Sequence, residues 1–440
     1  MNLRKHLKSL SDKLQGNPLL WKLALKVYGF RKFNSETLIY PAKTSNYEAF
    51  QNNSKKFDLV FDAQCLQTST RQRGIGTYSL SLVAAICQNN PTDNFAAVLT
   101  TVVEAEDLNL AYETLANLNY RNLEIIVFDP FETRQSLKLP EAQTRIKLFL
   151  ESICSGAVLC FSNFEQVRSA IPIPKSDVYR RVGILYDLIP LQFPDSLLVS
   201  KKQKTAYDWA LNNLKDFDLL LSISEETKRY WFRYVDSPAK VEVIHGGGIP
   251  KRSNNHKSFS ERSGVLCVGA EQPHKNIERL ISAYSLLPIE IQRQNGLTIL
   301  GIRSIGARKR LLKKARATTG NVQIPEYLET KDLLCMYEDA RLLVMPSIVE
   351  GLSLPILEAW SFGLVAVGGF NTVAQELIAA EILLFDPYDD ISISRKIAEY
   401  LTSNDSWTEA QVHSLLQSKV FTWDSTAMLA RKAIKGITHV

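Results

Sequence analysis

The feature that most constrains this chain is a repeated alternation of short apolar segments with longer helical patterns. The apolar segments are β-branched and hydrophobic on both faces, which is typical of parallel strands covered by helices on both sides. The expected strands are residues 58–63, 95–103, 123–128, 158–163, 182–188, 219–224, 240–245, 265–270, 297–302, 341–347, 364–369 and 382–385. The alternation predicts repeated βαβ units, and therefore an α/β fold with doubly wound sheets.

One polar stretch without periodicity, residues 250–264, interrupts the alternation. A chain of 440 residues is also too long for a single ordinary core. We therefore expect two Rossmann-like domains joined by a linker, with ligands bound at the carboxyl ends of their strands. The expected division is an N-terminal extension at 1–55, a first domain at 56–250, a linker at 251–262, a second domain at 263–418 and a C-terminal helix at 419–440 that crosses back to the first domain.

Composition and charge exclude several classes of protein. A hydrophobic content of 45% and a charged content of 22% are those of a folded globular protein. No apolar run reaches the roughly 18 residues that span a bilayer, and the first residues lack a secretory pattern. The six cysteines form no CxxC pair, so buried, reduced thiols and a cytoplasmic location are expected. No His/Cys cluster suggests a metal site, and with a net charge of only +6 no nucleic-acid partner is expected.

The sharpest local motif is PSIVEGLSLPILEAW at residues 346–360. A strand is expected to end near Ser347, and Pro355 suits the first turn of a helix. The loop between them would offer the N–H groups of Gly351, Leu352 and Ser353 to an anion. Glu350 and Glu358 flank this loop, where their carboxylates could accept hydrogen bonds from hydroxyls on either side of a diphosphate. An ordinary strand–turn–helix explains the same residues equally well.

This motif resembles the E-x7-E region of the large retaining glycosyltransferase family 4. Further segments resemble that family in the same order along the chain. They are VLCVGAEQPHKNIERLISAY from residue 265, DLLCMYEDA at 332–340, LLFDP at 383–387 and FTWDSTA at 421–427. In the first half, LQTSTRQRGIGTYSLSL resembles the glycine-rich loop of bacterial mannosyltransferases that build surface polysaccharide, and YDLIPLQFP and LSISEETKR also resemble family segments. The resemblance covers about residues 58 to 430 and implies the GT-B fold, two Rossmann-like domains facing each other across a cleft.

The resemblance also implies roles for particular residues. Glu358 should hold the donor ribose, and Glu350 should lie beside the transferred sugar. Lys275 should face the donor diphosphate, where a fixed cation stabilises the charge that grows as the glycosidic bond breaks. A solvated lysine at a helix start is the simpler explanation for Lys275. His274 stands where the family often has arginine, so one positive charge is missing or depends on pH.

The first domain should contribute the loop that contains Arg73, Gly74 and Gly76. The two glycines would let the backbone approach a ligand closely. Arg73 could contact a phosphate or be a surface charge. Asp187 could accept the acceptor's proton or cap a turn.

The predicted function is a retaining, metal-independent glycosyltransferase with no cofactor beyond its nucleotide-sugar donor. GDP-mannose is the favoured donor, and the acceptor is a growing cell-surface glycan, expected to be lipid-linked. Transfer from a UDP- or dTDP-sugar and a non-catalytic nucleotide-sugar-binding partner subunit remain alternatives. The leucine-striped basic segment at 1–33 predicts an amphipathic helix that either lies on an anionic membrane surface or packs on the protein itself.

Overall fold

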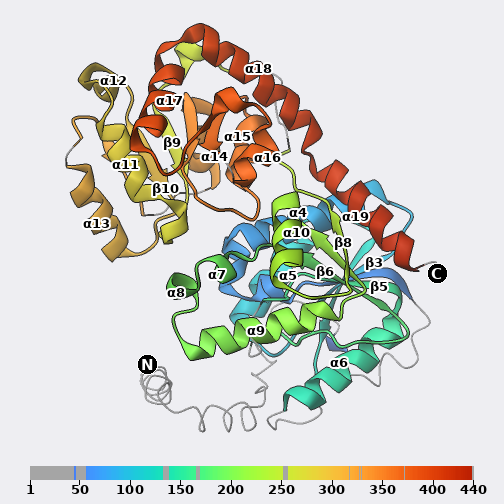
Figure 1. Cartoon of the computed structure of the whole chain (residues 1–440). Helices are drawn as coiled ribbons and strands as arrows, with labels where there is room; N and C mark the ends of the chain where they lie inside the picture. The colour runs from blue at the N-terminus through green and yellow to red at the C-terminus, as the bar shows by residue number, and fades with distance from the viewer. Residues whose placement is uncertain are drawn as a thin grey trace. The chain divides into compact units, whose positions relative to one another are not determined.

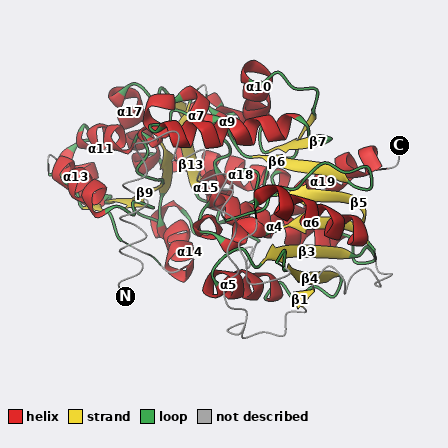
Figure 2. Cartoon of the chain, turned by 90° about the horizontal axis from the view of Figure 1, so that it is seen from below, coloured by secondary structure: helices red, strands yellow, loops and turns green. Residues whose placement is uncertain are grey.

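A computed structural model describes residues 44–45, 56–131, 138–164, 169–250, 256–316, 318–326, 328, 330–370 and 372–438. The amphipathic helix expected near the N-terminus lies outside these residues. The described chain forms two compact units, whose parts Figures 1 and 2 show as helices and strands. Of the described residues, the first unit contains those up to 184 together with 216–219 and 434–438, and the second contains those within 185–215 and 220–433.

The first sheet has eight strands in the order β1-β4-β3-β2-β5-β6-β7-β8. Its strands are β1 (Thr44–Ser45), β2 (Phe57–Asp62), β3 (Phe95–Thr100), β4 (Leu123–Phe128), β5 (Cys154–Cys160), β6 (Arg180–Leu185), β7 (Leu219–Ser222) and β8 (Lys240–Val243). The helices along this part of the chain are α4 (Gly74–Asn89), α5 (Ala105–Ala116), α6 (Leu139–Ile153), α7 (Ile189–Gln192), α8 (Pro194–Leu197), α9 (Lys201–Lys215) and α10 (Glu225–Tyr234). Every residue of β3 is buried, as expected for an apolar strand covered on both faces.

The second sheet has six strands in the order β11-β10-β9-β12-β13-β14. Its strands are β9 (Val265–Val268), β10 (Leu297–Leu300), β11 (Val322–Gln323), β12 (Leu342–Met345), β13 (Val365–Gly369) and β14 (Leu384–Phe385). The helices here are α11 (Ile277–Ser285), α12 (Ile289–Gln294), α13 (Ile305–Ala315), α14 (Thr330–Asp339), α15 (Leu354–Ser361), α16 (Val373–Ile378), α17 (Asp390–Thr402), α18 (Asn404–Val420) and α19 (Trp423–Thr438).

Both sheets follow the same winding rule. From β2 and from β9, the chain first adds two strands on one side and then returns to add strands on the other side. The pairings on both sides of β2 and of β9 are parallel. This doubly wound order confirms the fold class expected from the sequence. It places a topological switch point, where ligands bind in open α/β sheets, between β2 and β5 and between β9 and β12.

The last strand of the first sheet ends at Val243, and the first strand of the second sheet begins at Val265. The expected linker, residues 251–262, falls between these two residues, and its role as a domain boundary stays a prediction. The compact units divide the chain elsewhere, since residues 185–215 and 220–250 belong to the second unit. The end of the expected linker is also part of the second unit's interior. Arg262 is buried and donates hydrogen bonds to the carbonyl oxygens of Tyr337 and Ala340, and burial lowers the pKa of its guanidinium to about 10.

Five of the six cysteines are buried, as expected, but Cys335 on α14 is exposed. The expectation was wrong for Cys335 because its helix packs on one side only. Two short edge strands, β1 and β11, were not expected from the sequence. Each has two residues, too few for a period-2 pattern to be visible.

Candidate functional site

Lys275 lies at the end of a single 3-10 turn, Pro273–Lys275, which connects β9 to α11. The next residue, Asn276, has a left-handed backbone with φ of 58°, which is unfavourable for most side chains. Asn276 Nδ2 donates to the carbonyl oxygens of Pro346, at 3.0 Å, and of Pro387, at 2.7 Å. These two hydrogen bonds hold the turn against the segments that follow β12 and β14, and thereby fix the position of Lys275.

Glu350 lies in the loop that follows β12, across the switch point from Lys275. Lys275 Nζ donates to both carboxylate oxygens of Glu350 at 2.7 Å, and Ser347 Oγ donates to Oε1 at 2.7 Å. The side chain of Glu350 is 8% exposed and that of Lys275 is 20% exposed. Three hydrogen bonds from two side chains therefore hold the carboxylate, while the ammonium group remains within reach of a ligand.

His274, next to Lys275, is buried, and its Nδ1 has no hydrogen-bond partner among the described residues. Burial, assisted by the charge of Lys275, lowers the pKa of its imidazole to about 4. His274 is therefore neutral at pH 7 and does not replace the fixed charge of an arginine. Its carbonyl oxygen accepts a hydrogen bond of 2.8 Å from Ile348 N, which adds another connection to the loop after β12.

The loop from Gly351 to Ser353 leads into α15. A Cβ at position 351 would lie 2.3 Å from the carbonyl oxygen of Tyr186, so this close approach requires glycine. None of the backbone N–H groups of Gly351, Leu352 and Ser353 donates a hydrogen bond to a described residue. The buried Ser353 Oγ also has no partner among these residues. The loop thus presents several unused donors at the N-terminus of a helix, an arrangement suited to an anion.

Asp187 follows β6 and lies against the same loop, since a Cβ at Gly351 would be 2.8 Å from Asp187 Cβ. Its Oδ1 accepts a hydrogen bond of 3.1 Å from Ile189 N, which is the turn-capping role considered for it. Removal from water raises the pKa of the Asp187 carboxyl, and the carboxylate of Glu350 raises it further, against the opposing effect of Lys275. The charges of Lys275 and Glu350 therefore both influence the ionisation of the Asp187 carboxyl.

Glu358 lies on α15, where its Oε2 accepts a hydrogen bond of 2.6 Å from the hydroxyl of the buried Tyr337. Burial raises the pKa of the Glu358 carboxyl, and the bond from Tyr337 partly offsets that effect. Tyr337 was not singled out from the sequence, although it is the tyrosine of the family-like segment at 332–340. Its hydroxyl fixes one carboxylate oxygen and leaves the other for a ligand.

The remaining site candidates belong to the first unit. Arg73 precedes α4 as its N-cap residue, and both Arg73 and Gly74 are exposed. Gly76 has a packing role, since a Cβ there would lie 2.4 Å from the carbonyl oxygen of Arg71. The requirement for glycine at 76 therefore arises from its own loop. A role of Arg73, Gly74 and Gly76 toward a donor stays a prediction.

Residues 249–412 match the family model described as glycosyl transferases group 1. This part of the chain is a glycosyl transferases group 1 domain. Among curated proteins, a serotype-specific mannosyltransferase WbdA of Escherichia coli is 26% identical over 418 residues, which cover 87% of this chain and 48% of the relative. O-antigen chain mannosyltransferase B of E. coli is 36% identical over 173 residues, or 39% of this chain and 45% of the relative. The chain thus spans about half the length of these curated relatives.

Solved structures of GT-B proteins align with most of the chain, beyond the group 1 domain alone. Sucrose-phosphate synthase of Thermosynechococcus elongatus aligns with a TM-score of 0.63 at 13% identity, over 87% of this chain and 99% of that chain. The Anabaena protein HepE, in complex with UDP and glucose, aligns with a TM-score of 0.62 at 15% identity, over 86% of this chain and 99% of that chain. At these identities the likeness concerns the fold alone, and it confirms the expected GT-B architecture.

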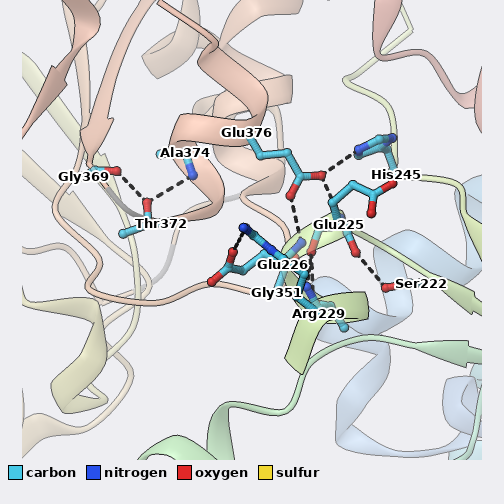
Figure 3. A network of polar contacts seen from close by, with 12 residues as sticks. Ser222, Glu225, Glu226, Arg229, His245, Gly351, Gly369, Thr372, Ala374 and Glu376 are labelled. Carbon is cyan, nitrogen blue, oxygen red and sulfur yellow. Dashed lines mark hydrogen bonds and ion pairs between the residues drawn. The ribbon is translucent and has the colours of Figure 1, made fainter. Parts of the chain in front are cut away.

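The second unit also contains a polar network that the sequence did not indicate (Figure 3). Glu376 on α16 accepts hydrogen bonds from the backbone N–H groups of Glu225, at 2.8 Å, and Glu226, at 3.0 Å, which begin α10. His245 Nε2 lies 2.8 Å from Glu376 Oε1. These bonds from His245 and the helix N–H groups lower the pKa of the Glu376 carboxyl, against the effect of burial. Glu376 thus caps a helix that is distant in sequence and holds α10 against α16.

Neither a group of metal-ligating side chains nor a membrane-spanning helix is found in the described ranges. No three His, Cys, Asp or Glu residues there lie close enough together to hold a metal ion. None of the helices in those ranges combines the length and the apolar character needed to cross a bilayer.

Proposed function

We propose that this chain is a retaining glycosyltransferase that moves a sugar from a nucleotide donor to a glycan acceptor without a metal ion. The observation that carries the proposal is the pairing of Lys275 with Glu350 beside the unused N–H groups that begin α15. An ammonium group has three N–H donors, and Glu350 accepts two of them. The third donor of Lys275 is available to the donor's diphosphate.

The reaction breaks the bond between the sugar's anomeric carbon and a diphosphate oxygen, and the nucleotide leaves with that electron pair. Charge on the leaving oxygen grows toward the transition state, so the fixed charge of Lys275 stabilises the transition state more than the ground state. Because Glu350 and Ser347 hold the cation in place beforehand, little reorganisation is needed when the bond breaks. The Gly351–Ser353 N–H groups act in the same direction.

Glu358 is proposed to bind the donor ribose with the carboxylate oxygen that Tyr337 leaves free. Asp187 is proposed to accept the acceptor's proton, since its raised pKa makes it a stronger base than an ordinary aspartate. Arg73, Gly74 and Gly76 are proposed to contribute donor contacts from the first unit, and His274 to line the site as a neutral side chain.

Mannose from GDP-mannose is the favoured donor, because two relatives from E. coli are named mannosyltransferases. The acceptor is then a growing surface glycan such as an O-antigen or capsule chain, expected to be lipid-linked. A cytoplasmic location at the inner face of the membrane, with the basic N-terminal segment on anionic lipid, accords with such an acceptor. A UDP-sugar is the second candidate, because HepE, of similar fold, was solved in complex with UDP and glucose.

A panel of sugar nucleotides tests the proposal. Purified full-length chain is incubated with GDP-mannose, UDP-glucose and dTDP-glucose, and nucleoside diphosphate release is measured with and without a mannose oligosaccharide. We expect release from GDP-mannose that rises with acceptor, is unaffected by EDTA and gives an α-linked product by NMR. Release from a UDP- or dTDP-sugar alone would establish the second candidate. Thermal stabilisation by a nucleoside diphosphate without any turnover would instead identify a non-catalytic binder.

A further inference from the structure

A groove of about 830 Å³ opens within the second unit beside the candidate site. Its lining comes from α10 and the segment around α7, and from the ends of β13 and β14 and the segment before α17. Ile348 and Val349 form part of its lining, and Val349 directly precedes Glu350. The groove therefore runs up to the loop that holds Glu350, and its volume lies in the ~300–1,000 Å³ range of ligand sites.

Aromatic rings are the most conspicuous part of this lining. Tyr230 and Tyr234 on α10 are stacked, with ring centroids 5.9 Å apart and planes inclined by 16°. Phe370, which is 38% exposed, and Tyr388, which is 61% exposed, also line the groove, and Tyr234 is 43% exposed. Phe370 N donates a 2.7 Å hydrogen bond to Phe385 O, so its backbone is held in place. Aromatic faces that remain exposed inside a groove are available to a ligand.

Charged groups accompany the rings. The guanidinium of Arg233 lies 5.6 Å from the centre of the Tyr234 ring, and Glu381 and Asp386 are among the other residues of the lining. Asp386 Oδ1 accepts a hydrogen bond of 2.8 Å from Tyr388 N, which ties the carboxylate to the ring beside it. Two carboxylates disfavour a phosphate in this groove, and three charged groups disfavour a lipid tail.

We propose that this groove is a subsite for the acceptor glycan, which binds sugar units beyond the one that receives the transferred residue. A pyranose ring has a face of C–H groups that packs on an aromatic ring and a rim of hydroxyls that donate to carboxylates and accept from guanidinium. The aromatic rings with Asp386, Glu381 and Arg233 match both parts of a sugar. The inference rests on the proposed function, since it assigns the groove to the acceptor of that reaction.

The test is direct binding of a linear mannotetraose to the full chain, followed by saturation-transfer NMR and by titration. Tyr388→Ala is expected to raise the dissociation constant about fivefold, which corresponds to the roughly 1 kcal/mol that one stacked ring contributes beyond its buried area. Tyr388→Phe retains the ring and should bind as the wild type does. Phe232→Ala is the matched control, because Phe232 is 56% exposed on the same α10 but does not line the groove.

Two outcomes would overturn the subsite. One is no measurable binding of mannotetraose by the wild-type chain, and the other is an equal loss of affinity in the Tyr388→Ala and Phe232→Ala variants. Donor hydrolysis by the wild-type chain is measured separately. If the chain binds mannotetraose through Tyr388 but hydrolyses no donor, the glycan subsite stands and the proposed function is wrong. If it hydrolyses donor but does not bind mannotetraose, the proposed function stands and the subsite is wrong.

Discussion

The first βα turn of each sheet occupies the same topological position, yet the two turns use their polar side chains in different ways. After β2, Gln64 Nε2 donates to Asp62 Oδ1 at 2.8 Å, and Gln67 exchanges hydrogen bonds with the backbone of Thr100. These side chains are all buried. After β9, Asn276 ties the turn to neighbouring loops, and Lys275 reaches Glu350 with its ammonium group partly exposed.

The turn after β2 thus stabilises its own unit, whereas the turn after β9 presents a charged side chain. In the first unit the polar groups of this turn satisfy one another, and the ion pair between Arg71 and Asp107, at 2.9 Å, also lies within the unit. In the second unit Asn276 fixes the backbone of the turn, and the side chain of Lys275 extends to Glu350, where the proposed site lies. The same winding therefore supports a structural turn in one place and a candidate reactive turn in another.

The largest expected effect compares the cations of the two turns. Lys275→Ala should lower turnover about a hundredfold to a thousandfold, the usual consequence of removing one preorganised donor from a transition state. Arg73→Ala, in the first unit, should lower it less than tenfold, because the exposed Arg73 side chain is not held in place. Steady-state kinetics over a range of donor concentrations measures both. Equal losses would remove the distinction between the two turns.

The two turns should also respond to pH in opposite directions. Burial raises the pKa of Asp62 to about 6, so this group's contribution to stability is present below about pH 4 and is lost as pH rises through about 6. His274, with its pKa lowered to about 4, contributes stability above about pH 6.5 that is lost as pH falls through about 4. Each pKa shift changes the free energy of unfolding by at most about 3 kcal/mol across its pH range.

Asp62→Asn and His274→Gln isolate these two contributions. Thermal unfolding of each variant and of the wild type is followed from pH 4 to pH 7. Relative to the wild type, Asp62→Asn should gain stability as pH rises, and His274→Gln should gain it as pH falls. A difference from the wild type that is constant across this range, for either variant, would contradict the shift assigned to that group.

A third comparison is between Glu358 and the tyrosine that holds it. Glu358→Gln should weaken donor binding by about 1.5–3 kcal/mol, because a charge-assisted hydrogen bond to the ribose is lost. Tyr337→Phe should weaken it less, because the carboxylate remains. Since burial raises the pKa of Glu358, donor affinity should also fall as pH drops and this carboxylate takes up a proton. Isothermal titration with GDP at several pH values measures these affinities. Unchanged affinity in the glutamine variant would show that Glu358 is not part of the site.

The smallest expected effect concerns glycines. Gly351→Ala should cost about 1–3 kcal/mol of stability, because the new Cβ meets the carbonyl oxygen of Tyr186 at 2.3 Å. Gly74→Ala, at an exposed position that begins α4, should be neutral or slightly stabilising. Thermal denaturation compares the two. Destabilisation of equal size would mean that the glycines of both loops are required by their surroundings.

Much of the fold and part of the site could be predicted from the sequence. The apolar segments expected as strands correspond to β2–β10 and β12–β14, because a buried parallel strand is recognisable from a few residues in a row. Ile277, Leu280, Ile281 and Tyr284 are all buried on α11, as their spacing predicts. The motif at 346–360 likewise indicated the loop that contains Glu350 and the helix that contains Glu358, since strand end, loop and helix start are all local.

Only the tertiary structure decided which side chains meet. Asn276 contacts the carbonyl oxygens of residues 70 and 111 positions away, and Glu376 caps a helix about 150 positions away in the chain. A single sequence contains no signal for such pairs, because they depend on which strand ends are neighbours in the sheet. The aromatic groove arises in the same way, from a helix and two strand ends that are adjacent only after folding. The neutral state of His274 also required the structure, because its cause is burial and not sequence context.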